Sequence, residues 1–241
     1  MCIRDRYVLF ATPLLLIVKE SGIRHRVDVA LVRESYTQLY RTFQRARTHT
    51  NLFRFIIARF IYTEALNTVA SFYVIYLVSI GVFTDEEALA LVTRVLLLAF
   101  ASSIVVGFAV SRFGSKRVLL VGVIGWTIFV AAAAIADTQS AFWVIAILGG
   151  CFWASPQIAD RVLLTRLAPD GQIGEFFGLF QMSGRLSSVI GPMLWGLTTT
   201  VLLNLGELRF RIAMMMAAAF LILGLLVLLW VREQREESDV S

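Results

Sequence analysis

Residues 118–136 read VLLVGVIGWTIFVAAAAIA and contain no charged side chain. An α-helix needs about 20 predominantly apolar residues to cross the roughly 30 Å of hydrocarbon in a bilayer. The run has this length, and Lys116 and Arg117 at one end and Asp137 at the other supply a polar boundary on each side. This stretch therefore predicts a transmembrane helix.

Five more apolar runs of spanning length surround it, and short polar breaks with turn residues separate them. Short breaks force neighbouring helices to run antiparallel. The sequence therefore predicts an all-α integral membrane fold, a bundle of six transmembrane helices at Leu52–Ile80, Ala88–Val110, Val118–Ala136, Phe142–Leu164, Phe176–Leu203 and Phe210–Val231.

Composition supports this assignment. Hydrophobic residues make up 58% of the 241 residues and charged residues 16%, against about 25% charged in soluble domains. The mean hydropathy is +0.77. Such a chain has too little polar surface to cover a soluble core, which argues against a cytosolic enzyme, a disordered tail and a secreted disulfide scaffold.

The segments outside the bundle divide the rest of the chain. We expect residues 1–18 to hold an artefactual start and the end of a further transmembrane helix, because the apolar run Tyr7–Val18 is too short to span. A signal-peptide core is the alternative. Residues 19–50 are expected to form a loop with an amphipathic helix, serving as a membrane-surface linker or as a docking site, residues 51–231 the six-helix domain, and residues 232–241 a tail.

Lysine and arginine set the expected orientation. One side of the predicted bundle carries fourteen of them near the helix ends, and the other carries only Arg209 and Arg211. Basic loops stay in the cytoplasm, so both termini and the 19–50 loop are expected there. Most of the net charge of +5 is then a topology signal, and the expected partner of the basic residues is the lipid bilayer rather than nucleic acid.

Polar and ionisable residues inside spans are costly, so they mark functional candidates. In the first span Glu64, Asn67, Thr68 and Ser71 share helical spacing and predict one inward-facing polar stripe, either a helix-packing cluster or a solute pathway.

The fourth and fifth spans hold the other candidates. Gln157 and Arg161 lie four residues apart beside Asp160, and substrate contact, a gate ion pair and interfacial snorkelling are alternative roles for Asp160 and Arg161. Arg185 lies too deep to snorkel easily, so it needs an anionic partner: Glu64, Asp160 or a substrate carboxylate. Gln181 lies one turn before Arg185.

The segment between the second and third spans resembles the loop signature of the major facilitator superfamily, Gly-x-x-x-Asp-Arg-x-Gly-Arg-Arg. Ser111 stands where that signature has its acidic residue, and Ser115 replaces a basic one. The matching positions, expected to act as a gating loop, are Gly107, Arg112, Gly114, Lys116 and Arg117.

Residues 58–68 and 174–192 resemble the vacuole-effluxer-like branch of this superfamily, which includes an exporter of vacuolar amino acids. The resemblance implies the carboxyl half of a twelve-helix fold: the end of helix six, then helices seven to twelve. The amino-terminal six-helix half would be a missing partner. The expected location is the inner membrane of a prokaryote.

The resemblance implies a secondary active transporter that moves a small polar solute, amino acids being one class, by alternating access. Glu64 would exchange a proton, Arg185 would contact Glu64 or a substrate carboxylate, and the neutral polar candidates would supply hydrogen bonds. No cofactor or metal is expected, and no motif of a membrane enzyme is present. The alternative is a six-helix scaffold or sensor subunit, or a dimerising half-carrier.

Overall fold

A computed structural model describes residues 44, 45, 47–169 and 171–231 of the chain. In this part the chain is almost entirely helical. The predicted segments 1–18 and 232–241, and nearly all of 19–50, lie outside the described residues. The helices are α3 (Thr50–Ser79), α4 (Asp85–Phe113), α5 (Ser115–Ile135), α6 (Gln139–Phe152), α7 (Ala154–Leu167), α8 (Ile173–Val201) and α9 (Leu208–Leu229), with a short 3₁₀ turn at Leu203–Leu205.

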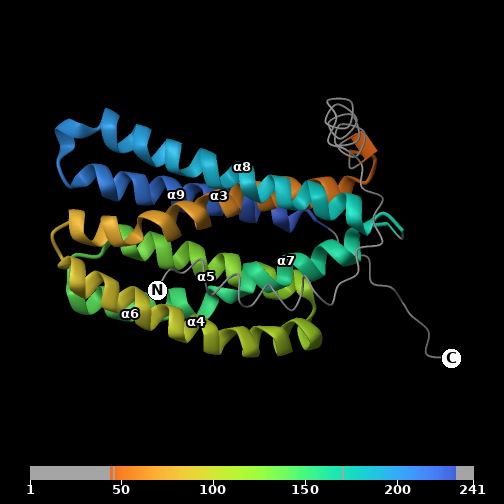
Figure 1. The fold of residues 1–241 in the computed structure, drawn as a ribbon, viewed down its shortest axis with the longest axis horizontal. Helices are drawn as coiled ribbons and strands as arrows, with labels where there is room; N and C mark the ends of the chain where they lie inside the picture. Colours follow the sequence, from red (N-terminus) through yellow and green to blue (C-terminus); the bar gives the residue numbers. More distant parts are fainter. Residues whose placement is uncertain (1–43, 46, 170, 232–241) are drawn as a thin grey trace, which may run out of the picture. The chain divides into compact units, whose positions relative to one another are not determined.

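The helices form a bundle in which successive spans run antiparallel, and α3 and α5 are the most buried of the candidate spans. Helix α3 packs against α8 and α9, α5 packs against α9, α7 and α6, and α4 packs against α6 and α7. Figure 1 shows α8 on one side of this bundle and α4 with α6 on the other. The predicted all-α fold is confirmed, with helix ends within a few residues of the expected ones.

The surface of the bundle is apolar over much of its area. Helix α4 exposes Leu97, Phe100 and Ile104, each at least 68% accessible. Among the described residues, five helical segments are long and apolar enough to cross a membrane: α3, α4, α5, the α6–α7 pair and α9. The fifth predicted span, α8, has 29 residues but is not among these five.

The fourth predicted span is one helical segment, Gln139–Leu167, that is interrupted at a single residue. Helix α6 ends at Phe152 and α7 begins at Ala154, with Trp153 between them. The cause is Pro156, which has no N–H to donate to the Phe152 carbonyl four residues earlier. The Trp126 indole Nε1 on α5 donates to that carbonyl instead, at 3.2 Å.

Helix α5 accommodates this break with glycines. A Cβ built on Gly125 would lie 2.3 Å from the Phe152 ring, and one built on Gly122 would lie 2.3 Å from the Ser155 Cβ. Only a residue without a side chain permits this approach. The interruption is therefore packed closely against these two glycines of α5.

The predicted gating loop is mostly helix. Gly107 and Arg112 belong to α4, Lys116 and Arg117 belong to α5, and only Gly114 lies between the two helices. Its φ of +88° is in the left-handed region that glycine adopts without strain. Gly114 therefore ends α4 and begins α5 in a one-residue turn, which is shorter than the loop expected from the sequence.

We predict that Trp126→Phe lowers the free energy of unfolding in detergent micelles by about 1 kcal/mol, because the Phe152 carbonyl loses its donor. Thermal unfolding measures this change. Trp230→Phe is the control, since Trp230 is 71% exposed. An equal loss in both variants would mean that the indole hydrogen bond has no special role.

Candidate functional site

A buried ion pair joins α3 to α7. The Arg59 Nε lies 3.2 Å from Asp160 Oδ2, and the Tyr62 hydroxyl donates a hydrogen bond to Asp160 Oδ1. Arg59 is 9% exposed and Asp160 4%. Both carboxylate oxygens therefore have partners, as a charge in an apolar interior requires.

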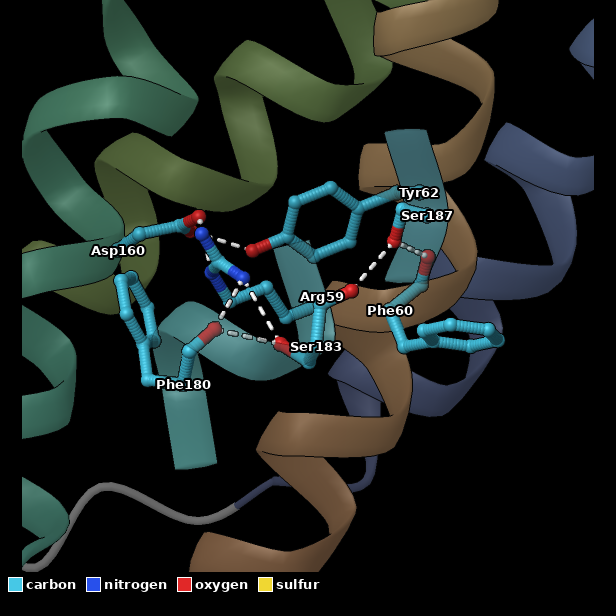
Figure 2. A network of polar contacts seen from close by, with 7 residues as sticks. All are labelled: Arg59, Phe60, Tyr62, Asp160, Phe180, Ser183 and Ser187. Carbon is cyan, nitrogen blue, oxygen red and sulfur yellow. Dashed lines mark hydrogen bonds and ion pairs between the residues drawn. The ribbon is translucent and has the colours of Figure 1, made fainter. Parts of the chain in front are cut away.

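The same guanidinium also binds α8. Its Nη1 donates to the Phe180 carbonyl and to the Ser183 Oγ, both at 2.9 Å, and its Cζ lies 3.5 Å from the centroid of the Phe180 ring. One helical turn further on, the Ser187 Oγ donates to the Phe60 carbonyl at 3.1 Å. Figure 2 shows the network, in which one arginine connects three helices.

The structure gives different environments to Asp160 and Arg161, which the sequence analysis considers together. Asp160 is buried against Arg59, whereas Arg161 is exposed on α7. Asp160 is one of the three anionic partners expected for Arg185, but its ion pair is with Arg59. In the sequence analysis, no role is predicted for Arg59, Tyr62 or Ser183. The available signal was the presence of one arginine and one aspartate at similar depths in two spans.

Glu64 lies on α3 at the contact with α8. It is 3% exposed, and its Oε2 has no hydrogen-bond partner among the residues that the structure describes. A Cβ built on Gly191 of α8 would lie 3.2 Å from its Oε1. The Thr68 hydroxyl donates to the Glu64 backbone carbonyl at 2.9 Å. A buried carboxylate thus lies between two helices without a cation beside it in the described residues.

The residues of the polar stripe predicted on α3 lie in different environments. Glu64 and Thr68 are buried against α8, Asn67 is half-buried and Ser71 is exposed. The structure therefore divides this stripe into a buried pair and a more accessible pair.

Helix α8 exposes two different strips, which helical periodicity separates. One contains only large apolar residues: Met182, Leu186, Val189, Ile190, Met193 and Leu197. The other contains exposed polar or small residues: Gly174, Gly178, Gln181, Arg185 and Ser188. On α7, Gln157 and Arg161 are exposed as well. Neither Arg161 nor Arg185 has an ion pair within the described ranges.

We predict that Arg59→Ala lowers the free energy of unfolding by about 3–5 kcal/mol, because it leaves the Asp160 carboxylate buried without a cation. The double variant Arg59→Ala/Asp160→Ala should lose less than the sum of the two single changes. Chemical unfolding in detergent micelles measures both. Arg161→Ala, an exposed arginine next to Asp160, is the matched control and should change stability by at most about 1 kcal/mol. Additive losses would contradict the coupling.

Comparison with known proteins supports a transporter family. The chain is 27% identical over 234 residues to an uncharacterized MFS-type transporter, YxiO, of Bacillus subtilis (strain 168), which covers 97% of this chain and 53% of the relative. It is 31% identical over 154 residues to the tetracenomycin C resistance and export protein of Streptomyces glaucescens, covering 62% of this chain and 28% of that protein. This chain therefore spans about half the length of the first relative and less of the second.

A crystal structure of the peptide transporter POT in complex with sulfate has the same fold, with a TM-score of 0.64 at 21% identity, over 73% of this chain and 36% of that one. The matched relatives are transporters rather than enzymes. The family model described as vacuole effluxer Atg22 like matches residues 6–241. The chain therefore belongs to the vacuole effluxer Atg22-like family of major facilitator transporters.

Proposed function

We propose that the protein containing this chain is a secondary active transporter that moves a small polar solute, amino acids being one class, by alternating access. The observation that carries the proposal is the polar strip of α8, which includes Arg185 near the middle of the helix. An arginine near the centre of a span is stable only where it faces protein or water, because lipid exposure costs about 2.5–3.5 kcal/mol or more.

The two exposed strips of α8 suit two different environments. The strip of large apolar residues suits lipid, and the strip with Gln181, Arg185 and Ser188 suits a water-filled pathway or a second protein surface. Gln157 and Arg161 on α7 add polar groups at the bundle surface. In this proposal the α7 and α8 groups bind the solute, Asn67 and Ser71 add hydrogen bonds, and Arg185 contacts its anionic group.

The pathway in this proposal is completed by a second six-helix half. Its support is that the chain spans 53% of the Bacillus relative, together with the polar strip that no described helix covers. Superfamily carriers place the solute between repeats near the middle of the membrane. The turn at Gly114, with Gly107, Arg112, Lys116 and Arg117 around it, would act in the gate at one end.

The proposed location is the inner membrane of a bacterium, with both chain ends in the cytoplasm. Two observations support it: the relatives named above come from bacteria, and basic residues are concentrated at one side of the spans.

In the complete carrier, Arg185→Ala should abolish solute transport while leaving the amount of protein in the membrane unchanged, because the solute loses its cationic contact. Uptake or efflux of labelled solute in proteoliposomes measures the effect. Arg185→Lys keeps the charge and should retain part of the activity. Transport at the wild-type rate in Arg185→Ala would rule out this role.

Glu64→Gln should remove the pH dependence of transport, since the amide has nearly the size of the carboxyl group but cannot exchange a proton. Initial rates measured across a pH series test this. Glu86→Gln, which changes an exposed carboxylate in the first turn of α4, should leave the pH profile unchanged. A preserved profile in Glu64→Gln would exclude Glu64 as the coupling site.

A further inference from the structure

Helix α8 seals the Glu64 carboxylate at a single close contact. A Cβ built on Gly191 would lie 2.0 Å from the Thr68 Oγ1 and 3.1 Å from the Glu64 backbone oxygen, as well as close to the carboxylate. The helices can therefore approach this closely only because residue 191 has no side chain. This approach leaves the carboxylate almost inaccessible.

A point of weakness in α8 lies beside that contact. Pro192 follows Gly191 within the helix and has no N–H to donate to the Ser188 carbonyl four residues earlier. Proline and glycine are where transmembrane helices bend. Helix α8 also packs chiefly on α3, with far less contact to α7 and α9. Bending at this position would move α8 away from α3 while breaking few contacts with α7 or α9.

Among the described residues, no cation forms an ion pair with the Glu64 carboxylate. The Thr68 hydroxyl donates to the backbone carbonyl of Glu64, and the guanidinium of Arg59, on the same helix, is bound to Asp160, Phe180 and Ser183. A sealed carboxylate of this kind is stable when it carries a proton. Exchange of that proton then requires water to reach the group.

We propose that the Gly191–Pro192 segment of α8 is the lid of a proton-binding site at Glu64. With α8 packed on α3, the carboxyl group is closed off. Bending at Pro192 lifts Gly191 from Thr68 and admits water, through which the proton leaves or enters. This inference rests on the proposed role of Glu64 in transport and identifies the element that controls access to it.

Water access to Glu64 is measurable without any transport. The chain, in its complete carrier and in membranes, is treated at constant pH with a water-soluble carbodiimide and glycine ethyl ester, and mass spectrometry gives the rate of amidation at Glu64. Gly191→Ala should raise this rate about tenfold, because the new methyl group overpacks the contact and holds α8 away from α3. Pro192→Ala restores a helix hydrogen bond and should lower the rate about fivefold.

The chain supplies matched controls. A Cβ on Gly196, one turn beyond Pro192, meets nothing within 4 Å, so Gly196→Ala should leave the rate unchanged. Adding Thr68→Ala to Gly191→Ala removes the closest clashing atom and should bring the rate back toward wild type. Exposed Glu86 provides an internal reference for reagent activity in every sample.

An unchanged Glu64 rate in both Gly191→Ala and Pro192→Ala would overturn the proposal. If Gly191→Ala does not accumulate in the membrane, the Pro192→Ala result decides alone. The proposed function fails separately: lid behaviour as expected, together with normal pH-dependent transport by Glu64→Gln, would leave α8 a lid over a group that transport does not use.

Discussion

The contact on which the rest of the bundle depends is the ion pair between Arg59 and Asp160. Neither charge can be left alone in an apolar interior, so α3 and α7 must meet at this depth and in this register. The Nη1 of the guanidinium then donates to the Phe180 carbonyl and to Ser183, which brings in α8. The need to satisfy one arginine thus positions three helices around the buried segment of α3 that carries Glu64.

Close packing of helices also stabilises the bundle, since helices in lipid gain little free energy from burying apolar side chains against one another. Glycines on α5 allow close approach of the segment where α6 meets α7, and Gly191 on α8 allows close approach of α3. At both places a proline lies next to the contact. The bundle therefore combines tight helix approach with local weakness of the helix, and the two polar residues of greatest interest, Asp160 and Glu64, lie near these positions.

The sequence predicted the spans well, because twenty apolar residues between charged ends have few alternatives as structures. It also identified Glu64 and Asp160 as unusual. It did not predict their partners: Arg59 is 101 positions from Asp160, and no periodicity along one helix reveals which groups meet across helices. Periodicity grouped Ser71 with Glu64, but α8 covers only one of them. The interruption at Trp153 was not predicted, and the hydrogen bond from the Trp126 indole to the Phe152 carbonyl depends on packing that one sequence does not show.

The one-residue turn at Gly114 has a mechanical consequence. Phe113 and Ser115 are two Cα–Cα steps apart, at most about 7.6 Å, so the adjoining ends of α4 and α5 cannot separate further. Two helices of 29 and 21 residues are thereby hinged at a common vertex. Because of this short link, a displacement of either helix at this end must also move the adjoining end of the other helix.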